Sequence, residues 1–209
     1  MNELEEKFYE TGVVPVVVLE DAEDAVPLAQ ALVEGGLLSA EVTFRTAAAE
    51  ESIRRMTEAF PQMLVGAGTV LTKEQVDAAA AAGAKFIVSP GFDSEIVDYC
   101  LEKKIPVLPG CISPSEVAQA VKRGLTIVKF FPAEQAGGIA MIKAMAAPYV
   151  GLKFMPTGGI NVGNLTEYLS CDKILCCGGS WMVKGDLVKA GNFGKIRGLS
   201  AETIDTIRK

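Results

Sequence analysis

An acid, a hydroxyl and a base alternate with apolar residues in the short stretch Glu41-Val42-Thr43-Phe44-Arg45. A carboxylate can move protons on and off carbon, and a guanidinium offers a planar pair of donors to a bound carboxylate. Side chains at alternate positions of an extended chain share a face, so Glu41, Thr43 and Arg45 lie together. The alternation alone is typical of a strand with one face in water. Chemistry here requires that face to be enclosed.

A second candidate is Lys129, in the middle of the apolar stretch Ile127-Val128-Lys129-Phe130-Phe131. A lysine in a strand commonly lies at an edge or extends to the surface, but this position has no evident route to water. A desolvated amine near a second cation such as Arg45 has a lowered pKa, and a neutral amine attacks ketones to form a Schiff base. Glu41 is then the candidate acid and base. Thr43 could help to orient either neighbour. The alternative is that Arg45 only forms a buried salt bridge with Glu41.

The composition removes several other kinds of chemistry. The 209 residues include no histidine, which disfavours zinc sites and imidazole-based triads, so we expect neither a metal nor a cofactor. The five cysteines form no C-x-x-C pair, which favours reduced thiols and a cytoplasmic location. With 20 basic and 26 acidic residues and no basic cluster, nucleic acid is not an expected partner. The apolar runs are too short to span a membrane, and the polar, acidic N-terminus predicts an amphipathic helix and not a secretory signal.

Short β-rich runs alternate with helical patterns along the whole chain. The expected strands are residues 13–19, 39–44, 63–68, 86–90, 105–110, 126–132, 153–159 and 173–179. The expected helices between them are residues 25–35, 47–60, 73–83, 94–104, 114–124, 138–149 and 163–169. Because no linker divides the chain, this order predicts a single-domain α/β fold over residues 1–209, a (β/α)8 TIM barrel with an N-terminal helix. A doubly wound open sheet is the alternative.

The barrel changes the interpretation of the alternating stretch. Neither face of a barrel strand meets bulk water, so Glu41, Thr43 and Arg45 would enter the interior, where polar groups are costly unless they bind a partner. They also lie toward the carboxyl end of their strand, where barrel active sites are found. The stretch is therefore expected to be functional.

Glycine-rich turns follow the last two expected strands. Pro156-Thr157-Gly158-Gly159-Ile160 and Gly178-Gly179-Ser180 lie where barrels commonly hold phosphate through backbone N–H groups and a hydroxyl. The turns at Gly66-Ala67-Gly68-Thr69 and Ser89-Pro90-Gly91 are weaker signals, because glycine also simply turns a chain. The sequence thus predicts a phosphate site formed by backbone dipoles in an acidic protein.

Seven motifs follow one another along the chain: Glu-Val-Thr-Phe-Arg-Thr, Val-Gly-Ala-Gly-Thr-Val-Leu, Ser-Pro-Gly, Pro-Gly-Cys-Ile-Ser, Val-Lys-Phe-Phe-Pro-Ala-Glu, Pro-Thr-Gly-Gly-Ile and Gly-Gly-Ser-Trp. In this order and spacing they closely resemble the 2-keto-3-deoxy-6-phosphogluconate (KDPG) aldolase family, relatives of which also cleave 4-hydroxy-2-oxoglutarate (KHG). The resemblance extends from Val13 to Val183, and Lys-Phe-Phe-Pro-Ala-Glu is its most specific part.

The resemblance implies a metal-independent class I aldolase of the Entner–Doudoroff pathway, a cytoplasmic homotrimer that splits KDPG into pyruvate and glyceraldehyde 3-phosphate. It assigns the Schiff base to Lys129 and the general acid and base to Glu41. It implies that Arg45 and Thr69 bind the carboxylate of the substrate. The remaining implied site residues are Pro90, Phe131 and Thr157 around the pocket, and Gly158, Gly159, Gly178, Gly179 and Ser180 at the phosphate.

Other functions remain open at this level. One is an aldolase for the galactonate-derived substrate, which Thr157 disfavours by the family pattern. Another is a phosphosugar isomerase or epimerase, which would share the phosphate loops but form no imine. The third is a non-catalytic sensor of phosphorylated sugar acids, which would bind without turnover.

Overall fold

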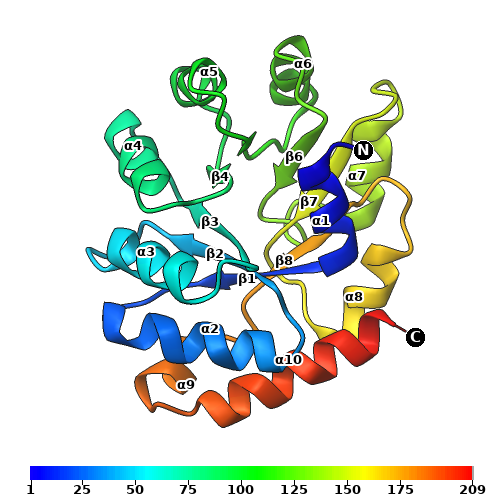
Figure 1. Ribbon diagram of the computed structural model, residues 1–209. Helices are drawn as coiled ribbons and strands as arrows, with labels where there is room; N and C mark the ends of the chain where they lie inside the picture. Colours follow the sequence, from blue (N-terminus) through cyan, green and yellow to red (C-terminus); the bar gives the residue numbers. More distant parts are fainter. Residues whose placement is uncertain (209) are drawn as a thin grey trace.

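Eight short strands alternate with helices along residues 1–208, the part of the chain that this computed structural model describes (Figure 1). Every strand falls inside a range expected from the sequence. The strands are β1 (Val13–Val17), β2 (Ser39–Thr43), β3 (Leu64–Gly68), β4 (Ile87–Val88), β5 (Val107–Leu108), β6 (Ile127–Phe130), β7 (Lys153–Pro156) and β8 (Cys177–Gly179).

Helices surround the strands, as Figure 1 shows. They are α1 (Glu3–Thr11), the short 3-10 helix η1 (Ala22–Asp24), α2 (Ala25–Glu34), α3 (Ala49–Ala59), α4 (Lys73–Ala81), α5 (Ser94–Glu102), α6 (Pro114–Lys122), α7 (Gly138–Ala146), α8 (Val162–Leu169), α9 (Gly185–Lys189) and α10 (Phe193–Ile207). The sequence did not predict α9 and α10. Gly194 and Gly198 weaken the helical pattern of α10, which forms because it packs along α2. Within the described chain, no helix is long and apolar enough to cross a membrane.

All of the strand pairs are parallel, but they do not form one continuous sheet. A six-stranded sheet has the order β5-β4-β3-β2-β1-β8, and β6 pairs with β7 separately. Isolated bridges join the two sheets, Gly110 with Lys129 on one side and Phe154 with Ile174 on the other. The structure therefore shows the expected α/β fold with parallel strands, in a partly closed sheet and not in a continuous eight-stranded barrel.

Prolines explain both interruptions. In the parallel register at Gly110 and Lys129, the next ladder bond would be donated by the N–H of residue 109, and Pro109 has none. In the register at Phe154 and Ile174, the next donor would be residue 156, and Pro156 has no N–H either. Each seam keeps its bridges but loses the bonds that would extend them into a ladder.

The strands separate two apolar clusters, as a sheet covered on both faces requires. The smaller, inner cluster joins β1, β3, β4, β5, β6 and β7 through Val14, Leu64, Val88, Leu108, Ile127 and Met155. The larger one lies between the strands and the surrounding helices. Cys176 belongs to the inner cluster and its neighbour Cys177 to the outer one, so adjacent side chains face opposite ways, as expected from strand geometry.

Helix α1 confirms the predicted N-terminal helix and closes one end of the inner cluster. Asn2 caps it, and the side chain of Glu5 returns to the Asn2 backbone N–H. Phe8 is fully buried, with its ring 4.9 Å from that of Phe86 in an edge-on arrangement. Glu5 also accepts a hydrogen bond from Thr126, just before β6. Because α1 covers the amino ends of the strands, access to the interior is left at their carboxyl ends.

Candidate active site

Lys129 and Glu41 form a buried pair in the interior. Lys129 Nζ, on β6, lies 3.1 Å from Glu41 Oε1, on β2, and the two side chains are 7% and 0% exposed. Lys129 therefore does not extend to the surface, which was the alternative from the sequence. The alternative of a buried salt bridge between Arg45 and Glu41 is also wrong: no such ion pair occurs among residues 1–208.

Gly68 makes room for the Glu41 carboxylate. A Cβ atom on Gly68 would lie 2.2 Å from Glu41 Oε1, so any other residue at this position of β3 would displace the carboxylate from its place beside Lys129. The second oxygen, Glu41 Oε2, is buried without a hydrogen-bond partner in the described structure. A buried polar atom left unsatisfied is costly, and active sites are where such atoms occur.

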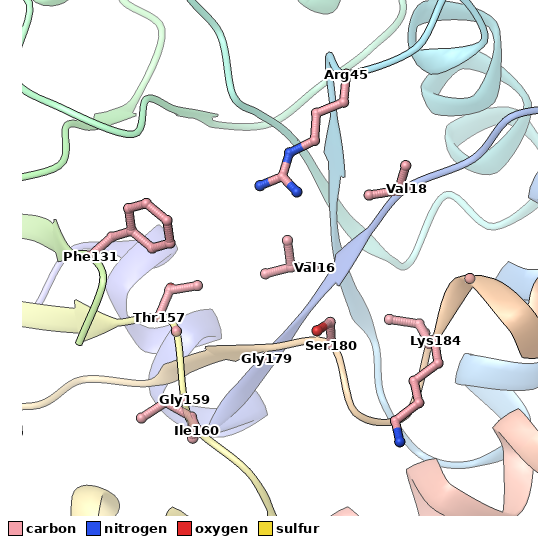
Figure 2. Close-up of a pocket in the computed structure, with 13 residues that line it drawn as sticks. Val16, Val18, Arg45, Phe131, Thr157, Gly159, Ile160, Gly179, Ser180 and Lys184 are labelled. Carbon is pink, nitrogen blue, oxygen red and sulfur yellow. The ribbon is translucent and has the colours of Figure 1, made fainter. Parts of the chain in front are cut away.

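A cavity of about 400 Å³ opens beyond the carboxyl ends of the strands (Figure 2). Its lining residues are Val16, Val18, Arg45, Phe131, Thr157, Gly158, Gly159, Ile160, Gly179, Ser180, Val183, Lys184 and Gly185. The Phe131 ring connects the cavity with the buried pair, because its centre is 5.5 Å from Lys129 Nζ. The buried pair, which does not itself line the cavity, is therefore adjacent to it.

One side of the cavity carries Arg45. Figure 2 shows its guanidinium pointing into the cavity, with Gly159, Gly179 and Ser180 along the other side. Arg45 Nε donates to Thr69 Oγ1 at 3.4 Å. Thr69 has a positive φ of 54°, which is strained for a β-branched residue and directs its hydroxyl toward Arg45.

The other side is formed by the turn at Gly158 and Gly159, whose φ angles are 101° and 81°. The carbonyls of Thr157 and Gly158 accept from the N–H groups of Ala133 and Glu134 at 2.9 and 3.1 Å. Across the described chain, no acceptor is found for the N–H groups of Gly158 and Gly159. Successive unpaired backbone N–H groups in a turn can form a concave anion-binding site.

Thr157 lies between the two sides. Its Oγ1 is buried and unpaired within residues 1–208, and a Cβ on Gly178 would lie 2.3 Å from it. Gly178 therefore serves Thr157 and does not line the cavity itself. Pro90 also lies outside the lining; its carbonyl contacts Gly110, the residue bridged to Lys129.

Thr43 has a structural partner. Its Oγ1 donates to the carbonyl of Val17 on β1 at 2.9 Å, and Ser39 Oγ does the same to Val13 at 3.0 Å. It does not orient Glu41 or Arg45. The hydroxyls of β2 tie this strand to β1.

Lys184 is a lining residue that was not expected from the sequence. It lies four residues after Ser180, at the start of α9, and is exposed, with its amino group turned away from Ser180 in Figure 2. A lysine after a glycine-rich turn was the available signal. The apolar lining residues Val16 and Val18 carried no chemical signal at all.

The α/β fold carries a buried amine and carboxylate beneath a cavity at the carboxyl ends of its strands. This arrangement is typical of α/β enzymes that act on small molecules. The comparisons narrow this class. Residues 4–199 match the family described as KDPG and KHG aldolase. The chain belongs to this family.

Individual relatives agree. The chain is 49% identical over 195 residues to the 2-dehydro-3-deoxy-phosphogluconate aldolase of Treponema pallidum, covering 93% of both chains. It is 42% identical over 201 residues to the KHG/KDPG aldolase of Escherichia coli K12, covering 96% of this chain and 94% of that one. A KDPG aldolase structure from Legionella pneumophila, with pyruvate captured as a covalent carbinolamine, has a TM-score of 0.92 at 40% identity and covers 97% and 98% of the two chains.

Proposed function

We propose that this protein is a class I aldolase that cleaves KDPG to pyruvate and glyceraldehyde 3-phosphate, with KHG as a second substrate. The observation that carries the proposal is the buried contact of 3.1 Å between Lys129 Nζ and Glu41 Oε1 beside a cavity. An amine in this position can form a Schiff base with the ketone of a substrate, and a carboxylate this close can transfer the protons that the reaction requires. Family membership supports the same reaction.

In the proposed reaction, Lys129 gives a proton to Glu41 and attacks the keto carbon C2 to form a carbinolamine. Glu41 returns this proton to the carbinolamine hydroxyl, which leaves as water, so that an iminium forms and Glu41 is again a carboxylate. Glu41 then takes the proton of the C4 hydroxyl as the C3–C4 bond breaks. The electron pair of that bond moves toward the iminium nitrogen, which gives an enamine, and glyceraldehyde 3-phosphate leaves. Protonation of the enamine at C3 and hydrolysis of the imine release pyruvate and regenerate the amine. The iminium is the electron sink, so the step uses neither a metal nor a cofactor.

The two sides of the cavity suit the two charged ends of this substrate. Arg45 and Thr69 would bind the carboxylate, since a guanidinium fork matches it. Gly158, Gly159, Gly179 and Ser180 would hold the phosphate through backbone N–H groups and a hydroxyl, while Gly178 leaves room for Thr157 beside them. Phe131, Thr157 and Pro90 would shape the space around C2.

We also propose that the strands close as a single-domain (β/α)8 barrel and that the protein is a cytoplasmic homotrimer. The bridges at both seams support the closed barrel. Light scattering after gel filtration would measure the assembly, and a mass three times that of the chain is expected.

Trapping with pyruvate and borohydride tests the mechanism. Reduction should leave a covalent pyruvyl adduct on Lys129, located by peptide mass spectrometry, and Lys129→Met should show none. Wild-type protein that is folded but forms no adduct would contradict an imine mechanism and favour the isomerase or epimerase alternative.

A coupled lactate dehydrogenase assay tests the substrate. We expect kcat/KM for KDPG to exceed that for its galactonate-derived analogue and for KHG. Saturable binding of KDPG with no pyruvate release would indicate the non-catalytic sensor.

A further inference from the structure

Glu134 ends the motif that includes Lys129, yet its side chain has no part in the site described above. It lies directly behind the glycine turn: a Cβ on Gly159 would be 2.4 Å from Glu134 Cγ and 2.6 Å from Glu134 Cβ. The Glu134 side chain therefore occupies the space that any other residue at 159 would need. Its backbone N–H also donates to the Gly158 carbonyl at 3.1 Å.

Tyr168, on α8, fixes the direction of the Glu134 carboxylate. Its side chain is 2% exposed, and its hydroxyl donates to Glu134 Oε1. Burial, and then the hydrogen bond to Glu134, raise the pKa of Tyr168, so this hydroxyl remains a protonated donor at neutral pH. The contact joins α8 to the segment after β6.

The carboxylate lies on the far side of the turn from the active-site cavity. Glu134 and Tyr168 line a second cavity of about 400 Å³, together with Gly138, Asn164 and Glu167. Neither Glu134 nor Tyr168 lines the active-site cavity. Tyr168 thus holds a negative charge away from the place where the anion would bind.

Three consecutive carbonyls of the turn are bound from this outer side. Ala133 N–H donates to Thr157, Glu134 N–H donates to Gly158, and the side-chain amide of Asn164 donates to Gly159 at 3.1 Å. A peptide with its carbonyl held on one side presents its N–H on the other. The outer contacts therefore determine where the unpaired N–H groups of the turn point.

We propose that Glu134, oriented by Tyr168, is a positioning residue for the anion-binding turn at Gly158 and Gly159. It acts through the turn and does not touch the substrate. The inference rests on the proposed function, because it assigns the role of this turn in binding the substrate phosphate.

The test compares Glu134→Ala, Tyr168→Phe and the conservative Glu134→Gln, whose amide oxygen still accepts from Tyr168. Glu134→Ala and Tyr168→Phe both remove the hydrogen bond between Tyr168 and Glu134. Each should raise KM for KDPG about tenfold, because a tenfold change corresponds to about the free energy of one hydrogen bond to a charged group. The rate of borohydride trapping with pyruvate, which has no phosphate, should be unchanged in all three. Glu134→Gln should retain the KM of the wild type.

Tyr99→Phe is the matched control. Tyr99 also donates to a carboxylate, Asp77 Oδ2 at 2.8 Å, but between α5 and α4, away from the turn. It should leave KM for KDPG unchanged. A tenfold effect in this control as well would overturn the inference.

Calorimetric titration with inorganic phosphate alone measures anion binding at the glycine turn in the absence of catalysis. We expect weaker phosphate binding in Tyr168→Phe and Glu134→Ala than in the wild type and Tyr99→Phe. Unchanged phosphate binding, a parallel fall in pyruvate trapping, or a Glu134→Gln variant as impaired as Glu134→Ala would each overturn the inference. A wild-type protein that binds phosphate but releases no pyruvate would instead contradict the proposed function and leave the positioning role to be judged by the titration.

Discussion

Glu41 is fully buried, and one of its oxygens has no partner in residues 1–208. Its other oxygen contacts Lys129, so the unpaired oxygen is the one available to a substrate hydroxyl or a bound water. The alternation of residues 41–45 indicated the face on which Glu41 lies, and the structure confirms that it meets Lys129. The alternation did not indicate that the Thr43 hydroxyl, two residues away on the same strand, donates to β1 instead.

Glu41→Gln separates imine formation from proton transfer. The amide retains the shape of the side chain but cannot accept a proton, so turnover of KDPG should fall by roughly 10²–10⁴-fold, the usual size of general acid–base catalysis. Trapping of pyruvate on Lys129 should remain detectable. Steady-state kinetics beside the trapping assay measure both, and full turnover in this variant would show that Glu41 is structural.

Thr43→Val tests the structural role of the neighbouring hydroxyl. It removes the 2.9 Å side-chain bond to the Val17 carbonyl and leaves the parallel pairing of β1 with β2 in place. The free energy of unfolding should fall by about 0.5–1.5 kcal/mol, the net contribution of one hydrogen bond, measured by urea denaturation. Thr43→Ser keeps the hydroxyl and serves as the control; a large fall in kcat with unchanged stability would show that Thr43 acts in catalysis.

At the scale of elements, most strands were predictable because they are short apolar runs next to glycine or proline, and β2 was predictable from its alternation of polar and apolar residues. The observed β4 and β5 contain only two residues each, shorter than the patterns that predicted them. Pro109 and Pro156 remove the donors that would extend the ladders at the two seams. The position of α10 was not predictable, since its burial depends on α2, more than a hundred residues earlier in the chain.

Helix α1 is expected to stabilise the fold without entering the reaction. Phe8→Ala would leave a void against Phe86 in the inner cluster and should lower the free energy of unfolding by about 3–5 kcal/mol. Because α1 lies at the amino ends of the strands, KM for KDPG should not change at a temperature where the variant is folded. Urea denaturation and steady-state kinetics test this, with the exposed Tyr9→Ala as control. A raised KM in folded Phe8→Ala would contradict this separation of roles.

For the molecule as a whole, anion binding does not follow from net charge. The chain carries a net charge of −6, so the proposed binding of an anionic substrate would depend on local groups, the Arg45 guanidinium on one side and backbone N–H groups on the other. The accessibility of the five cysteines also depends on the fold, which buries all five as free thiols. The absence of a C-x-x-C pair had already favoured reduced thiols.

Cysteine reactivity should report on folding. Burial raises the pKa of Cys100 to about 11 and, with a smaller contribution from Glu116, that of Cys111 to about 12. Near neutral pH these buried thiols stay protonated and inaccessible, so a thiol reagent should react slowly with native protein and rapidly in urea. Since unfolded thiols ionise at lower pH than buried ones, stability should also fall as the pH rises above the ordinary thiol pKa. Rapid labelling of the native protein would contradict the burial.

The sequence alone determined the order of the eight strands and of the helices as far as α8, the interior position of Glu41 and Lys129, and the glycine turns at 158–159 and 178–179. These follow from local rules: alternation along a strand, apolar runs, and the freedom of glycine. The tertiary structure alone decided that Thr43 bonds to β1 and that Lys184 borders the cavity. It also decided that Glu134 and Tyr168 meet behind Gly159, because that contact requires segments after β6, after β7 and on α8 to pack together, and no local pattern encodes their distance.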